Sequence, residues 1–116
     1  MTETAHKALA LLATEWFKCA RRSVRLAMET APTRFERERS QIAYSSQLVQ
    51  DTLSAHGMRI QDFEGTPYST SLPAEPVNPE DFDTEEGLVV SETVEPTIIH
   101  DGKVVMRGKI VLGRAQ

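Results

Sequence analysis

This 116-residue chain has little of several features that usually narrow a protein's function. Its one cysteine, Cys19, cannot form an internal disulfide, and no segment resembles a secretory leader, so we expect a cytoplasmic protein. No apolar run approaches the ~18–20 residues that cross a bilayer, so we expect no membrane span. Aromatic residues make up only 6% of the chain, which excludes a large aromatic core.

Positive charge is also scarce. The chain has 17 acidic and 13 basic residues and a net charge of -4, which argues against binding to nucleic acid. Residues 75–95 contain no lysine or arginine, whereas the first third holds a basic cluster. We expect a solvated helix face there, with a partner-docking surface as the alternative. The cluster consists of Lys18, Arg21, Arg22, Arg25, Arg34, Arg37 and Arg39.

Signatures of catalysis are absent from the sequence. It contains no phosphate-binding loop, no nucleophile elbow and no dinucleotide fingerprint. His6, His56 and His100 are scattered and none has a second ligand at metal spacing, so we expect structural or solvated roles for them. The acidic run 80–86 lacks the mid-loop glycine of a calcium loop and indicates a solvated loop. We therefore predict a binding protein with no catalytic residue, metal or cofactor. A small metal-dependent enzyme that uses the acidic loop is a minor alternative.

The first 30 residues have the pattern of one long helix, capped by Thr2 or Thr4. Two apolar sets lie side by side on it, and this stripe is broad enough to need burial on two flanks. The burying partner is another helix of the same chain or of a second copy, and we predict a homodimer through coiled-coil-like contacts of the first set. Cys19 is expected to pack inertly there. The first set is Leu9, Leu12, Trp16, Cys19 and Leu26, and the second is Ala13, Phe17, Ala20, Val24 and Ala27.

Pro32 interrupts this pattern because proline cannot continue a helix without losing a hydrogen bond. Thr33 and Glu36 then fit a capping box, which predicts a second helix over about 34–55. An antiparallel helical hairpin and a long kinked arm both fit this arrangement. Gly57 follows at the usual terminating position. Residues 1–56 are thus predicted to form a helical arm that mediates oligomerisation.

Residues 57–116 have the pattern of a small β domain. Apolar and polar residues alternate over 58–63, which predicts a half-buried strand. Prolines and a glycine then disfavour regular structure through Asp83, and residues 66–83 are predicted to form an ordered wrapping loop. Tyr68, Leu72 and Phe82 are the expected anchors of that loop.

The strongest local signal lies near the C-terminus. Asp101 and Gly102 separate two β-branched runs, and this dipeptide suits a two-residue hairpin turn with positive φ at both positions. Pro96 divides the run 88–100 into two short strands or one bent strand. Gly108 predicts a bulge or a close approach in the last strand. The fold class is therefore α+β, with an N-terminal helix or helical hairpin followed by a small, mainly antiparallel β domain.

This layout resembles the GrpE family of nucleotide exchange factors for DnaK-type chaperones. Residues 101–112 (DGKVVMRGKIVL) are similar to the family's closing hairpin, and residues 85–90 (EEGLVV) to its acidic turn leading into a valine strand. The resemblance implies a dimerising helix and a β domain that contacts an ATPase. The family's arginine aligns with Met106, one residue before Arg107, and the helical arm is short. These departures favour a divergent member dedicated to a specialised chaperone-like ATPase.

Two functional hypotheses follow. The first is a GrpE-like adaptor that acts on a DnaK-type or other actin-like ATPase by binding its open state. The second is a non-catalytic structural or assembly subunit that docks through its apolar helix. For the first, the candidate contact residues are Arg59, Lys103, Arg107 and Lys109, and solvation of an outer strand face is the alternative role for these cations.

Overall fold

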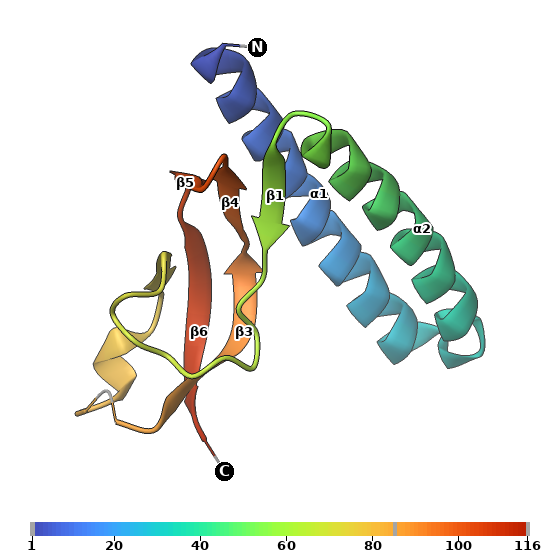
Figure 1. Cartoon of the computed structure of the whole chain (residues 1–116). Helices are drawn as coiled ribbons and strands as arrows, with labels where there is room; N and C mark the ends of the chain where they lie inside the picture. The colour runs from blue at the N-terminus through green and yellow to red at the C-terminus, as the bar shows by residue number, and fades with distance from the viewer. Residues whose placement is uncertain (1, 85, 116) are drawn as a thin grey trace.

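The computed structural model describes residues 2–84 and 86–115 and confirms the α+β fold class. Two helices come first in the chain, and strands with short 3-10 turns occupy the rest (Figure 1). The elements are α1 (Glu3–Thr30), η1 (Pro32–Arg34), α2 (Phe35–Ser54), β1 (Met58–Gln61), β2 (Ala74–Pro76), η2 (Pro79–Asp81), β3 (Leu88–Glu95), β4 (Thr97–His100), β5 (Lys103–Met106) and β6 (Gly108–Arg114).

The helices form an antiparallel hairpin, which settles the choice between a hairpin and a kinked arm (Figure 1). The side chain of Thr2 caps α1 by accepting a hydrogen bond from the Ala5 N–H at 3.1 Å. The predicted capping box is wrong, because Pro32 starts a 3-10 turn that runs directly into α2. In that turn the Arg34 N–H donates to Ala31 O at 2.9 Å, and no side chain caps α2.

Two three-stranded sheets, not one, make up the β region. Their strand orders are β1-β4-β5 and β2-β6-β3. The chain passes from the second sheet to the first at Pro96, and it returns to the second sheet at Gly108. Asp101 and Gly102 have φ values of 48° and 80°, which confirms the predicted turn between β4 and β5.

Gly108 allows the two connections between the sheets to lie against each other. A Cβ atom at this position would lie 2.6 Å from the carbonyl oxygen of Glu95 and 2.9 Å from the main-chain atoms Pro96 C and Thr97 N. The side-chain oxygen of Thr97 also accepts a hydrogen bond from the Gly108 N–H at 3.2 Å. The predicted close approach is confirmed, and its reason is the exchange of the chain between sheets.

Each sheet has its own hydrophobic core. The first core joins the helical hairpin to the first sheet through residues such as Ala10, Leu53, Met58 and Ile98. The second core lies between the second sheet and the loop that precedes it. The predicted boundary after residue 56 therefore coincides with the link between α2 and β1, but the first core crosses it.

The loop 66–83 is an ordered wrap, as predicted, since Tyr68, Leu72 and Phe82 pack against the second core. The expectation that it lacks regular structure is wrong. Within it, β2 pairs with β6 in parallel and η2 follows. Pro76 is tolerated because it ends an edge strand, where its missing N–H costs no ladder hydrogen bond. The strand predicted over 58–63 is also shorter and ends at Gln61.

The molecule is a flat slab with extents of 43 × 40 × 17 Å. Its radius of gyration is 15.6 Å, whereas a compact domain of this length has about 13 Å. Splitting the interior into two small cores leaves more apolar side chains at the surface than a single core would. Such exposed apolar surfaces are candidate binding sites.

Candidate protein-binding surfaces

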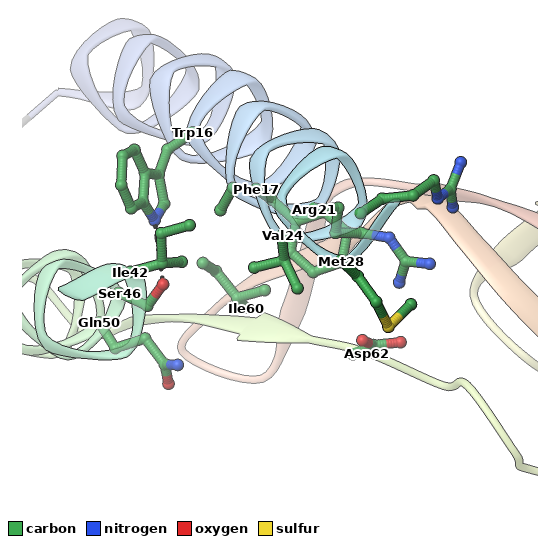
Figure 2. A pocket seen from close by; sticks show the side chains of 12 residues that line it. Trp16, Phe17, Arg21, Val24, Met28, Ile42, Ser46, Gln50, Ile60 and Asp62 are labelled. Atoms are coloured by element: carbon green, nitrogen blue, oxygen red, sulfur yellow. Dashed lines mark hydrogen bonds between the residues drawn. The ribbon is translucent and has the colours of Figure 1, made fainter. Parts of the chain in front are cut away.

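An apolar groove of about 510 Å³ lies between α1, α2 and β1 (Figure 2). Phe17 and Val24 project from α1 toward Ile60 on β1, and Ile42 closes the side formed by α2. Asp62 lies at the end of the groove near Met28 (Figure 2). We call this hollow the inner groove. Its volume and mainly apolar lining lie in the range of pockets that bind small apolar groups.

Trp16 fixes the end of the inner groove nearest the middle of α2. Its indole N–H donates to Ser46 Oγ at 3.3 Å, shown as a dashed line in Figure 2. A buried or half-buried indole needs such a partner because burial removes its N–H from water and otherwise leaves it without a hydrogen bond. Trp16 was predicted to contact a second copy, but in this structure its polar edge is bound within the chain.

A network of ion pairs connects α1 to the β region beside the groove. Arg25 contacts Glu92 at 2.6 Å, and Arg21 contacts Glu64 at 2.8 Å and Glu92 at 3.6 Å. The hydrogen bond that Arg25 donates to Glu92 raises the pKa of Arg25. Part of the basic cluster is thus bound to acidic groups of its own chain, a role that neither sequence-based interpretation foresaw.

Lys18 continues this network toward the second sheet. It contacts Glu15 at 3.1 Å and Glu95 at 3.4 Å, and Glu95 also contacts Lys109 at 3.7 Å. Hydrogen bonds to Glu15 and then Glu95 raise the pKa of Lys18. These partly exposed pairs contribute little stability each. Together they join α1 to β3 of the second sheet.

The predicted dimerisation residues divide into two groups. Leu9 packs against the first core and is half-buried, as is Trp16. Leu12, Cys19 and Leu26 are exposed, at 67% for Leu12 and 57% for Leu26. Cys19 does not pack within the chain, because the helix turns that side away from α2 and the sheets, so the inert packing predicted for it would need a second copy.

The exposed group continues onto α2. Leu12 and Leu48 line one shallow hollow of about 340 Å³ between the two helices, and Tyr44 lies one turn before Leu48. We call Leu12, Cys19, Leu26, Tyr44 and Leu48 the outer face. Tyr44 is 69% exposed and Leu48 52%. A row of large apolar side chains on a helical hairpin is typical of a surface that contacts another protein.

The four cations proposed as ATPase contacts are all exposed, but they do not share one surface. Arg59 pairs across the sheet with Ile99, and Lys103 pairs with His100. Since Ile99 and His100 are consecutive, Arg59 and Lys103 lie on opposite faces of the first sheet. Arg107 lies in the connection from β5 to β6, while Lys109 lies beside Glu95. Lys103 and Arg107, at the two ends of β5, are the pair that one partner surface would reach most directly.

Within residues 2–84 and 86–115, no group of three or more histidine, cysteine or carboxylate side chains could hold a metal ion. Glu85, part of the acidic loop considered above, lies outside the described residues. Neither described helix is long and apolar enough to cross a membrane.

Comparisons with known proteins leave these surfaces to be interpreted on their own. No protein-family model, curated protein or solved structure matches the chain.

The inner groove was not predicted from the sequence. One signal for it was present, namely the second apolar set of the first helix, to which Phe17 and Val24 belong. The sequence could not indicate that Ile42 and Ile60 complete the groove, because the three elements meet only in the tertiary structure. For the ion pairs, a signal was present in the sequence. The basic residues Lys18, Arg21 and Arg25 and the acidic residues Glu92 and Glu95 each recur at intervals of three or four positions.

Proposed function

We propose that the chain is a GrpE-like adaptor that acts on a DnaK-type or other actin-like ATPase by binding its open state. It would work in the cytoplasm without catalytic residues of its own. The observation that carries this proposal is the arrangement of the elements: a helical hairpin packs on a small sheet that contains the β4–β5 turn, and a second sheet beside it has its own core (Figure 1). That order of elements is the one on which the resemblance to the GrpE family rests.

The mechanism requires only a difference in affinity. A protein that binds the open nucleotide cleft more tightly than the closed one shifts the ATPase toward the open state and so speeds nucleotide release. A complete shift from 1:99 to 99:1 needs about a 10⁴-fold difference in affinity. The flat, rigid face of a small sheet suits this task, because it loses little conformational entropy on binding.

Lys103 and Arg107 are the contacts we propose for the ATPase. Lys103 begins β5, an edge strand of the first sheet, Arg107 directly follows that strand, and both side chains are exposed. An acidic surface on the partner would attract them, and such contacts increase the association rate more than the final affinity.

The test measures release of a fluorescent nucleotide from each DnaK-type ATPase of the same genome, with and without this protein. Acceleration with at least one ATPase is expected. The double variant Lys103→Glu/Arg107→Glu should lose most of the acceleration at low salt, whereas the matched control Arg37→Glu, a reversal on an exposed position of α2, should retain it. No acceleration with any ATPase would contradict the proposal.

A second candidate function is that of a structural or assembly subunit, and the outer face favours it. Leu12, Leu26 and Leu48 are all more than half exposed. A second copy that covered them would stabilise the pair by about 25 cal/mol for each Å² of apolar surface removed from water. We propose a homodimer through this face under either function. Light scattering at micromolar concentration should give twice the chain mass, and Leu12→Ser/Leu26→Ser should reduce it to a monomer. A monomeric wild-type protein would rule out this pairing.

A further inference from the structure

All three histidines of the chain gather at one end of the molecule, although they are far apart in the sequence. His6 lies near the start of α1, His56 lies in the turn between α2 and β1, and His100 ends β4. Figure 1 shows these segments at the same end of the molecule. The rings of His6 and His100 have centroids 3.8 Å apart with 33° between their planes. The sequence predicted structural or solvated roles for these histidines, and the fold stacks two of them.

The charged groups around this pair come from every element that meets there. On α1, Glu3 and Lys7 contact each other at 3.9 Å and are exposed to solvent. At the turn between β4 and β5, Asp101 Oδ2 lies 3.3 Å from His100 Nε2. The Asp101 N–H donates to Gly57 O at 3.0 Å, which fixes this turn beside the end of α2.

Two further charges flank the pair at the sheet. Lys103 is the cross-strand partner of His100, so its ammonium adds positive charge on the same face of the first sheet. Arg59 on β1 lies on the opposite face and contacts Gln61. Asp101 is thus the only carboxylate in contact with either ring among the described ion pairs, and it contacts His100 rather than His6.

Protonation of His6 is disfavoured by this arrangement. Burial lowers the pKa of His6 from its usual value of 6.5, and the charges of His100, of the amino terminus and of His56 lower it further, while Asp101 acts in the opposite direction. A cation near the start of a helix also opposes the helix dipole. Because the folded state holds fewer protons on His6 than the unfolded chain does, this group stabilises the fold above pH 6.5. That contribution is lost as the pH falls through the lowered pKa of His6.

We propose that the stacked His6–His100 pair is an acid-sensitive contact, which holds the first turns of α1 against the β4–β5 turn and releases them when both rings are protonated. Neutral imidazoles can stack at 3.8 Å, whereas two imidazolium ions at that separation repel each other. Release would expose Leu9 and Ala10, which cover the first core beside Met58 and Ile98. The start of α1 therefore loosens on mild acidification while the second core, which contains no histidine, stays intact.

The experiment measures amide hydrogen exchange at residues 6–12 between pH 7.5 and 5, corrected for the intrinsic effect of pH. Wild-type protein should lose protection there by about fivefold or more, the effect of two unit charges about 4 Å apart in water, while β3 and β6 keep theirs. His6→Phe retains an aromatic ring without a titrating group and should abolish the pH dependence. The control His56→Gln removes a nearby charge outside the stack and should leave the dependence in place.

A second measurement tests the same contact without relying on one variant. Proton NMR titration of the imidazole signals should give a pKa for His6 that rises toward its usual value in His100→Phe. Equal loss of protection in wild type and His6→Phe would overturn the proposal. So would a pKa of His6 that stays the same in His100→Phe.

Discussion

Gly108→Ala is the substitution that most directly tests the exchange of the chain between the two sheets. The added methyl group would lie 2.6 Å from Glu95 O and 2.9 Å from Pro96 C and Thr97 N, all of which are main-chain atoms. Because no flexible side chain can move out of the way, the strands at the junction must shift. Overpacking of this kind costs typically 1–3 kcal/mol, and close contact with three main-chain atoms of residues 95–97 places this site at the upper end, at about 2–3 kcal/mol.

The assay is chemical denaturation followed by circular dichroism and by Trp16 fluorescence, together with a thermal melt. At about 4 °C per kcal/mol for a domain of this size, the melting temperature should fall by roughly 8–12 °C. Gly113→Ala is the matched control, because it makes the same substitution in the same strand but meets a side-chain atom, Ser91 Cβ, at 3.2 Å. The control should cost clearly less than Gly108→Ala, because its closest contact is longer and involves one atom of an exposed residue. Equal stability of the two variants would refute the steric argument.

Three further predictions concern the first core, the ion pairs and the start of α1. Ile98→Ala removes a fully buried side chain of the first core and should cost about 2–5 kcal/mol in denaturant melts, whereas Val104→Ala on the exposed face should cost no more than about 1 kcal/mol. Glu92→Gln removes the partner of Arg25 and should lower the unfolding midpoint slightly at low salt, with the difference vanishing near about 1 M salt. Thr2→Ala should cost about 1 kcal/mol and speed exchange of the Ala5 amide, whose capping acceptor is lost.

The sequence by itself determined the features that depend on a few neighbouring residues. Three residues set the helical boundaries by local effects. Thr2 caps the first helix, Pro32 lacks a backbone donor between the helices, and Gly57 adopts a positive φ of 72° after the second. The Asp101–Gly102 turn belongs to the same class, since its two positive φ values need only those residue types. The broad apolar stripe of the first helix also predicted burial on more than one flank.

Only the tertiary structure decided which segments meet. The pairing of Ala74 with Gly108 joins residues 34 positions apart, and no local pattern specifies a partner at that distance. The same applies to the stack of His6 on His100 and to the closure of the inner groove by Ile60. Which flank of α1 faces the sheets was also open, and the answer left Cys19 exposed. Backbone conformation follows from short-range sterics and hydrogen bonding. Contacts between distant segments depend on which apolar side chains pack together in each of the two cores.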